Sequence, residues 1–260
     1  MKIIVLVKQV PDTFDERRLD LTSGVLDRAT GENVADEIAE RALEVALRYK
    51  DAHRETEVVA LSMGPDSVTK ALRKALSMGA DSAIHVLDDA LAGADAGCTA
   101  AVLAQAAKQA GFDLVVAGDE STDGRGGVVP AMIAEHLGLP HLSFLNSVDI
   151  TENAIVGERS TENGSMRVSA SGPAVISVTE RAADARFPSF KGIMTAKRKP
   201  LSVLSLGDLG IDRGVVSGGR GRSAVVTVSE RPQRTAGKKI VDGGDAGEQL
   251  AEFLIAGRLV

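Results

Sequence analysis

Residues 113–137, DLVVAGDESTDGRGGVVPAMIAEHL, contain the pattern that decides the fold. The stretch begins with a short apolar segment, Asp113–Gly118, continues through a glycine-rich loop, and ends in a helical pattern at Val129–Leu137. An apolar run of this length is typical of a strand buried on both faces of a parallel sheet. Strand, loop and helix together predict one βα unit of an α/β fold, in which ligands bind at the carboxyl ends of the strands.

The same alternation extends back to the N-terminus. Further apolar runs lie at Ile3–Val10, Glu57–Ser62 and Ser82–Leu87. Between them, apolar residues recur at helical spacing in Asp36–Tyr49, Asp66–Met78 and Ala96–Ala110. Asp36 and Asp66 are predicted to be N-cap or first-turn residues, because a carboxylate there meets free amides and the helix dipole. The first half therefore predicts a doubly wound, mostly parallel sheet.

The second half has a different pattern. It predicts strands at Ala154–Ser160, Met166–Ala170 and Ala174–Thr179. The Asn-Gly pair at 163–164 predicts a hairpin between the first two. From 212 to 239 the chain is rich in Gly, Ser and Arg; only Ala224–Val228 resembles a strand, and a helix is expected near Gly247–Ala256. We interpret 1–211 as one α/β domain and 212–260 as an extended C-terminal arm that lies on a partner or across the surface.

Composition excludes several classes of protein. The 260 residues are 44% hydrophobic and 25% charged, which is ordinary for a globular domain with a full core. A formal net charge of −6 and an aromatic content of 3% argue against a nucleic-acid or anionic-membrane surface. The apolar start is too short for a signal peptide, and no run reaches the roughly 20 residues of a membrane span. We therefore expect a cytoplasmic protein that neither binds nucleic acid nor inserts into a membrane.

The loop within Gly118–Pro130 is a candidate phosphate site. Its four glycines allow tight turns and close approach of backbone amides to an anion at a helix N-terminus. Ser121, Thr122 and Arg125 add donors and a positive charge. The loop matches neither a P-loop nor a dinucleotide fingerprint, and it also contains the carboxylates of Asp119, Glu120 and Asp123. These would repel phosphate unless they turn away or bond to ribose hydroxyls, so an ordinary flexible loop stays an alternative.

Two other segments carry a possible function. The turn Ser62–Asp66 is expected at the same edge of the sheet, where it is either structural or part of the ligand site. Around Phe187 and Phe190 lies a basic cluster, formed by Arg186, Lys191, Lys197, Arg198 and Lys199. A solvated basic face explains the charges alone, whereas two phenylalanines in a polar loop indicate partner docking.

Taken in order, these segments resemble the electron transfer flavoprotein beta (small) subunit family over essentially the whole chain. The motifs that carry the resemblance are Val7–Asp12, Asp36–Ala42, Ser62–Pro65, Ala75–Asp81, the 118–130 loop, Arg186–Ser189 with Ile193–Lys197, and Pro232–Gly237. The resemblance implies a fold of the adenine-nucleotide alpha hydrolase type and a heterodimer with an alpha subunit that binds most of the FAD. It implies an electron carrier that serves acyl-CoA and other primary dehydrogenases and delivers to a quinone oxidoreductase or another acceptor.

The resemblance also implies a structural AMP and a recognition loop for the dehydrogenases. By motif, the AMP contacts are Leu6, Asn33, Val34, Ala35, Asp36, Met63, Gly118, Asp119, Glu120, Ser121, Thr122, Asp123, Gly124, Arg125, Gly126, Gly127, Val128 and Val129. The docking residues are Arg186, Phe187, Pro188, Ser189, Phe190, Lys191, Ile193, Met194 and Lys197, with Phe190 at the anchor position.

The chain departs from the family pattern at several places. Many relatives have Lys-Gln-Ala-Ile-Asp at 119–123, Asn-Pro at 33–34, and leucine at the anchor. A second branch of the family bifurcates electrons, places a second FAD in the beta site, and often carries Gly-Ala-Asp-Thr. Here Gly93–Thr99 lacks the first threonine, which favours AMP over a second FAD.

Two functions of other classes compete with this interpretation. A stand-alone adenine-nucleotide-binding module explains the first half but leaves the phenylalanine loop and the arm without a role. A nucleotide hydrolase would need a metal or base among the acidic residues of the 118–130 loop. The four histidines show no metal-ligand spacing and Cys98 has no nucleophile motif beside it, so we expect no catalytic set.

Overall fold

The computed structural model describes residues 1–28, 30–151, 154–216, 225–234, 236–237 and 239–260. The chain divides into two compact units, Met1–Val226 and Thr227–Val260. Among the described residues, no helix is both long enough and apolar enough to cross a membrane. The predicted domain boundary after residue 211 stays a prediction.

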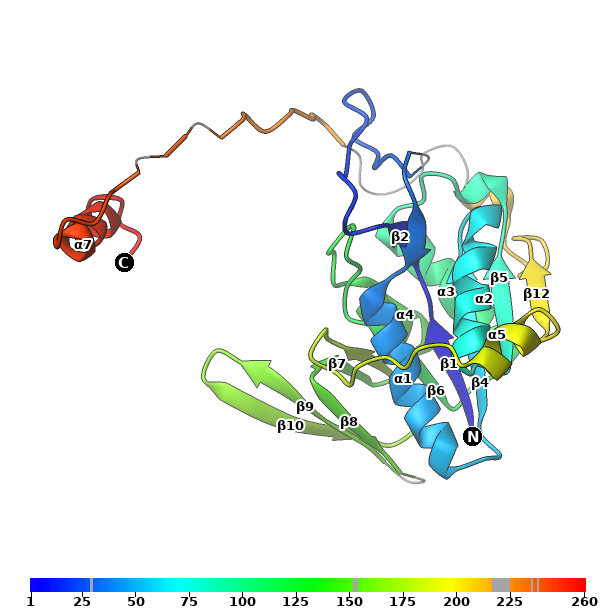
Figure 1. Ribbon diagram of the computed structural model, residues 1–260. Helices are drawn as coiled ribbons and strands as arrows, with labels where there is room; N and C mark the ends of the chain where they lie inside the picture. The colour runs from blue at the N-terminus through cyan, green and yellow to red at the C-terminus, as the bar shows by residue number, and fades with distance from the viewer. Residues whose placement is uncertain (29, 152–153, 217–224, 235, 238) are drawn as a thin grey trace. The chain divides into compact units, whose positions relative to one another are not determined.

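A seven-stranded sheet forms the centre of the first unit (Figure 1). Its order is β12 (Leu201–Leu204), β5 (Ser82–Val86), β4 (Glu57–Met63), β1 (Lys2–Leu6), β6 (Leu114–Gly118), β11 (Ala174–Val178) and β7 (His141–Leu145). Neighbouring strands are parallel throughout, which confirms the predicted fold class. From β1 the chain first builds β4 and β5 on one side and then returns to place β6 on the other. The gap between β1 and β6 is therefore the topological switch point, where open α/β sheets bind ligands.

Helices cover both faces of this sheet (Figure 1). The helices are α1 (Glu37–Ala52) and α2 (Thr69–Met78) on one face, and α3 (Ala96–Ala110) and α4 (Val129–Leu137) on the other. Because side chains alternate along a strand, Ile3 and Val5 pack in the α1/α2 core and Ile4 in the α3/α4 core. Burial on both faces is the reason that the strand sequences are almost continuously apolar.

Smaller elements surround the sheet. They are the antiparallel pair β2 (Gln9–Pro11) and β3 (Asn33–Ala35), the 3-10 turns η1 (Asp66–Val68) and η2 (Asp89–Leu91), the three-stranded sheet β8 (Ser147–Ile150), β9 (Ile155–Thr161) and β10 (Gly164–Ala170), and the helices α5 (Phe190–Ala196) and α6 (Arg213–Val216). In the second unit, α7 (Ala246–Ala256) forms where a C-terminal helix is predicted. The β9–β10 pair confirms the predicted hairpin at 163–164.

Two sequence predictions were wrong in detail. The run Ile3–Val10 is not one strand, since β1 ends at Leu6 and the chain turns away to pair β2 with β3. The turn follows because the Lys8 carbonyl accepts from the Asp36 amide, 2.9 Å away, instead of continuing the ladder to β4. The second error is the strand at Ala224–Val228: residues 225–228 carry no strand, and residue 224 lies outside the described residues.

Candidate functional site

Three of the predicted nucleotide contacts meet at the switch point. Leu6, Met63 and Gly118 are the last residues of β1, β4 and β6, three adjacent strands of the sheet. All three are partly exposed, whereas the residue immediately before each of them is buried. The carboxyl edge of the sheet therefore presents two apolar side chains and one glycine at the place where a ligand is expected.

A buried carboxylate joins the start of α1 to the glycine-rich loop. Asp36 is 1% exposed and caps α1, where its Oδ1 accepts from the amides of Ile38 at 3.0 Å and Ala39 at 3.3 Å. Its Oδ2 accepts from the backbone amide of Thr122 at 2.7 Å and from the Thr122 hydroxyl at 2.8 Å. The predicted N-cap is confirmed, and the same side chain holds the loop.

The other predicted contacts of this region lie in β3. Asn33, Val34 and Ala35 pair with Pro11, Val10 and Gln9, and lead directly into Asp36. The Asn33 side-chain amide donates to the Arg28 carbonyl at 2.8 Å. The Arg17 guanidinium donates to the carbonyl of Thr122. Arg17 thus joins the segment that precedes β3 directly to the loop.

Asp123 is compensated by two cations. Its side chain is fully buried and accepts from Lys8 Nζ and Arg28 Nη2, each at 2.7 Å, and from the Ser121 hydroxyl at 2.6 Å. Burial alone would raise the pKa of this carboxyl, but the bonds and charges of these partners outweigh it and hold the pKa far below its usual range. The Asp123 charge is therefore already balanced within the protein and does not oppose a bound phosphate.

The first two acidic residues of the loop behave differently. The Asp119 amide donates to the Val178 carbonyl at 2.8 Å, and its carboxylate accepts from the Glu120 amide at 2.8 Å. Burial, with help from the charges of Glu120 and Glu180, raises the pKa of the Asp119 carboxyl. Glu120 lies 3.6 Å from the Arg125 guanidinium.

The end of the loop offers unused donors. In the described part of the chain, the amides of Gly126, Gly127 and Val128 have no hydrogen-bond acceptor, and no side chain caps the start of α4. A Cβ added at Gly126 would meet nothing within 4 Å, and Gly127 has φ +64°. Free amides at a helix N-terminus hydrogen-bond anions and place them at the positive end of the helix dipole. The loop can therefore receive a phosphate between 126 and 128.

The second candidate site is built on α5. Its predicted docking residues are Arg186, Phe187, Pro188 and Ser189, which precede the helix, Phe190, Lys191, Ile193 and Met194 within it, and Lys197 at its C-cap. Ser189 caps the helix by accepting from the Gly192 amide at 3.0 Å. Arg73 of α2 donates to the carbonyls of Ala196 at 2.8 Å and Lys199 at 3.1 Å, so the far end of α5 is also fixed.

Arg186 anchors this segment to α1. Its guanidinium donates to Glu44 Oε2 at 2.7 Å, to Glu44 Oε1 at 3.0 Å and to Asp51 at 2.8 Å. Burial would raise the pKa of Glu44, but the Arg186 hydrogen bonds and charge lower it. The charge of Arg186 is therefore used within the protein, whereas Lys191 and Lys197 are exposed.

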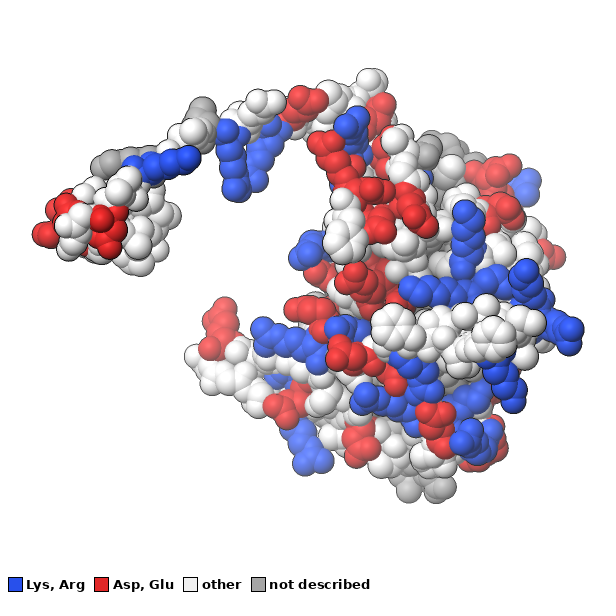
Figure 2. Space-filling view, viewed as in Figure 1, with Lys and Arg blue, Asp and Glu red and all other residues white. Residues whose placement is uncertain are grey.

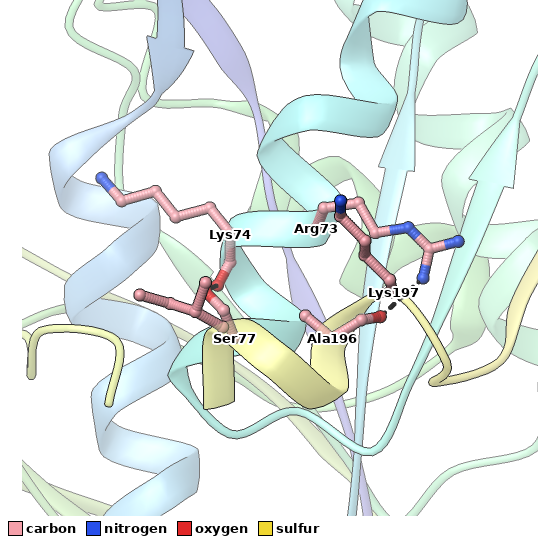
Figure 3. A pocket seen from close by; sticks show the side chains of 6 residues that line it. Arg73, Lys74, Ser77, Ala196 and Lys197 are labelled. Carbon is pink, nitrogen blue, oxygen red and sulfur yellow. Dashed lines mark hydrogen bonds between the residues drawn. The ribbon is translucent and has the colours of Figure 1, made fainter. Parts of the chain in front are cut away.

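The apolar side chains of the segment face solvent. Phe187 is 94% exposed, Phe190 82% and Met194 63%. Figure 2 shows uncharged residues, in white, bordered by basic side chains on the part of the surface formed by α5. Beside them, α2 and α5 enclose an open hollow of about 630 Å³, which is lined by Arg73, Lys74, Ser77, Ile193, Ala196 and Lys197 (Figure 3). A rigidly held apolar surface with a basic border is typical of a protein-docking site.

Comparison with known proteins decides the family. An electron transfer flavoprotein domain model matches residues 23–209. The electron transfer flavoprotein subunit beta of Mycobacterium tuberculosis (strain ATCC 25618 / H37Rv) is 46% identical, and the match covers 99% of each chain. This chain belongs to the electron transfer flavoprotein beta subunit family. The subunit beta of Megasphaera elsdenii is 31% identical over the full length of both chains, and the caffeyl-CoA reductase-Etf complex subunit CarD of Acetobacterium woodii is 32% identical over 81% of this chain and 80% of its own.

The sequence did not identify every residue that shapes the 118–130 loop of this beta subunit. Lys8 lies in the Val7–Asp12 motif, but nothing local shows that it binds Asp123. Arg28 lies 95 residues from Asp123 and carries no motif at all. Phe144 has φ +57° in β7, and its ring lies 3.8 Å from where a Cβ of Gly127 would be. These contacts join distant segments, so only the fold reveals them.

Proposed function

We propose that this chain is the beta subunit of a heterodimeric electron transfer flavoprotein, which binds AMP structurally, helps an alpha subunit hold FAD, and docks primary dehydrogenases. FAD, held mainly by the alpha subunit, would supply the redox chemistry. Electrons would come from acyl-CoA and other dehydrogenases and pass to a quinone oxidoreductase or another acceptor. In this proposal the chain binds and orients, and has no catalytic set of its own.

The observation that carries the AMP proposal is the row of free amides at 126–128, beside the switch point. Of the side chains nearby, Leu6 and Met63 offer apolar surface for adenine, and the compensated Asp123 does not oppose phosphate. The residues present therefore fit an adenosine monophosphate with its phosphate at the start of α4. Of the first two acidic residues, the partly exposed Glu120 is the one that faces solvent enough to meet ribose hydroxyls, since Asp119 is buried and already accepts from the Glu120 amide.

The second unit supports a heterodimer. No residue of α7 is buried, although Leu250, Phe253 and Ile255 are large and apolar. Exposed apolar side chains at this density on one helix indicate a surface that another protein covers. We assign the alpha subunit to that role, which agrees with the interpretation of 212–260 as an arm.

The first test is nucleotide extraction and mass spectrometry on the chain co-purified with its alpha partner. One FAD and one AMP per heterodimer is the expected result. Two FAD and no AMP would place the chain in the bifurcating branch, with a flavin at the 118–129 loop. A stable, monomeric chain that needs no alpha partner would favour the stand-alone nucleotide-binding module.

Replacing Gly126 with valine is expected to expel AMP. A Cβ at this position meets nothing within 4 Å, so the free protein has room for it, whereas a bulky side chain beside the free amides should block the close approach of a phosphate to the backbone. Extraction should then recover FAD without stoichiometric AMP. Gly126→Ala is the graded control and should retain more nucleotide. Stoichiometric AMP in the valine variant would contradict the placement of the phosphate.

Replacing Phe190 with alanine is expected to slow reduction by a cognate dehydrogenase. Loss of a central aromatic anchor costs about 2 kcal/mol or more of binding free energy, or a factor of about 30 in affinity. Flavin content should not change, because the side chain docks and does not hold the cofactor. The measurement is the second-order rate of flavin reduction by dehydrogenase; loss of FAD would show instead that α5 supports the cofactor site.

A further inference from the structure

His85 is a fully buried histidine that the proposed function leaves without a role. It lies in β5 and is 0% exposed. Its Nε2 is 2.9 Å from the carbonyl oxygen of Gly64, at the turn that follows β4. A carbonyl oxygen can only accept, so Nε2 carries a proton and donates. The other ring nitrogen, Nδ1, is buried and has no partner among the described residues.

Ser62 supplies the complementary group. Its hydroxyl is also buried without a partner among the described residues. Ser62 and His85 are register partners on the neighbouring parallel strands β4 and β5, so their side chains lie side by side on one face of the sheet. A protonated Nε2 leaves Nδ1 as an acceptor, and a hydroxyl is a donor. Two adjacent buried groups of opposite hydrogen-bonding character are each costly to leave unpaired.

The turn that His85 holds is the Ser62–Pro65 segment of the proposed nucleotide site. The Gly64 amide donates to the Val86 carbonyl at 3.1 Å, and the Gly64 carbonyl accepts from His85, so both polar groups of Gly64 are tied to β5. A Cβ at Gly64 would lie 2.7 Å from a methyl group of Val68, so the turn packs tightly against η1. Met63, immediately before Gly64, is the proposed apolar contact of adenine. The conformation of this turn decides where Met63 meets the ligand.

We propose that His85 is a positioning residue for the nucleotide site: its ring, protonated at Nε2 and accepting at Nδ1 from the Ser62 hydroxyl, fixes the Gly64 carbonyl and with it the Met63 contact. The pairing requires the hydroxyl to turn toward Nδ1 by rotation about the Ser62 Cα–Cβ bond, or to meet it through one bound water, because the structure shows both atoms without a partner among the described residues. The role of His85 in ligand binding rests on the proposed AMP site. The hydrogen bonding of the His85 ring is independent of the AMP site.

The tautomer is tested by NMR on the heterodimer in which only this chain carries ¹⁵N-histidine. Long-range ¹H–¹⁵N spectra should show His85, assigned by its loss in His85→Gln, with the proton on Nε2. Ser62→Ala should shift the Nδ1 resonance, because it removes the donor. A proton on Nδ1, or an Nδ1 resonance that Ser62→Ala leaves unchanged, would overturn the pairing.

The positioning role is tested by calorimetric titration of AMP into the nucleotide-stripped heterodimer. His85→Leu should weaken AMP about tenfold, the scale of one lost buried hydrogen bond, while His85→Gln, whose amide can still donate to Gly64, should restore most of the affinity. His53→Leu is the matched control: it also removes a ring-to-carbonyl contact, to Tyr49 at 3.0 Å, but at the C-cap of α1, and should not change affinity.

The outcomes separate the two proposals. Wild-type affinity in His85→Leu, or equal losses in His85→Leu and His85→Gln, would overturn the positioning role while leaving the AMP site intact. No AMP uptake by the wild-type heterodimer would instead overturn the proposed function. If His85→Leu does not fold, the AMP affinities of His85→Gln and Ser62→Ala are compared instead. Together with the tautomer spectrum, they still decide the positioning role of His85.

Discussion

Replacing Asp36 with alanine is expected to lower the free energy of unfolding by about 3 kcal/mol or more. The change removes the N-cap of α1, which typically costs about 1 kcal/mol, and leaves the Thr122 amide and hydroxyl buried without an acceptor, at about 1–3 kcal/mol for each such group. Denaturant unfolding of the heterodimer measures the loss. Since Asp36 is the link that holds the 118–129 loop to α1, AMP affinity should fall together with stability.

Asp66 is the matched control, because both residues are predicted from the sequence as N-cap or first-turn acids. The structure places Asp66 in the first turn of η1, exposed and without a side-chain cap hydrogen bond. Asp66→Ala should therefore change stability by less than about 0.5 kcal/mol. Asp36→Asn should lie between the two, since one amide oxygen cannot serve α1 and the loop together. Equal effects of Asp36→Ala and Asp66→Ala would contradict the linking role of Asp36.

The difference between these two aspartates shows what the sequence can predict. The N-cap of α1 is a local interaction, in which Asp36 bonds residues two and three positions ahead. The second half of its role, the bond to Thr122, joins residues 86 positions apart. The N-cap follows from local chemistry. The bond to Thr122 forms only because the fold places β1 next to β6.

The effect of a charged residue is equally hard to predict from the sequence when its partners lie far away along the chain. In the sequence Asp123 is a carboxylate that opposes phosphate, and Arg186 is a basic residue of a docking loop. In the structure Lys8 and Arg28 balance Asp123, and Glu44 binds the Arg186 guanidinium with two hydrogen bonds. These partners are between 95 and 142 residues away along the chain. Their effect on the site depends on tertiary contacts, which cannot be derived from the spacing of residues in the sequence.

Within the central sheet, strand prediction succeeded where both faces of a strand are buried. β1, β4 and β6 are almost continuously apolar and were found, whereas β7 and β12 were not. β7 (His141–Leu145) carries His141, Ser143 and a partly exposed Phe144, and β12 is an edge strand with exposed Ser202 and Val203. An edge strand needs apolar residues on fewer positions, so its pattern is weak. The short β8 (Ser147–Ile150) was missed for a similar reason, since half of its residues face solvent.

Replacing Gly192 with alanine is expected to displace α5 and to abolish most productive docking. A Cβ at this position would lie far inside van der Waals contact with the Ser77 carbonyl oxygen, a backbone atom of α2. Neither side can yield easily, because Arg73 and Lys199 hold the end of α5 to α2 through backbone carbonyls. Relief of such a clash costs about 1–3 kcal/mol of stability, and moving α5 moves Phe190 with it. The rate of flavin reduction by dehydrogenase should fall at least as far as in Phe190→Ala.

Phe190→Ala and Gly192→Ala distinguish the role of the docking side chain from the role of the α2–α5 contact that holds α5 in place. Phe190→Ala removes an exposed side chain, so docking should weaken while the melting temperature does not change. Gly192→Ala should lower both, because the defect lies at the α2–α5 contact. Gly247→Ala in α7 is the control for the substitution itself: a Cβ there meets nothing within 4 Å in this chain, and Gly247 lies outside α5, so docking of the dehydrogenase should not suffer. If Gly192→Ala keeps wild-type electron transfer, the orientation of α5 does not determine docking, and the apolar side chains act without the rigid support that Ser189 and Arg73 provide.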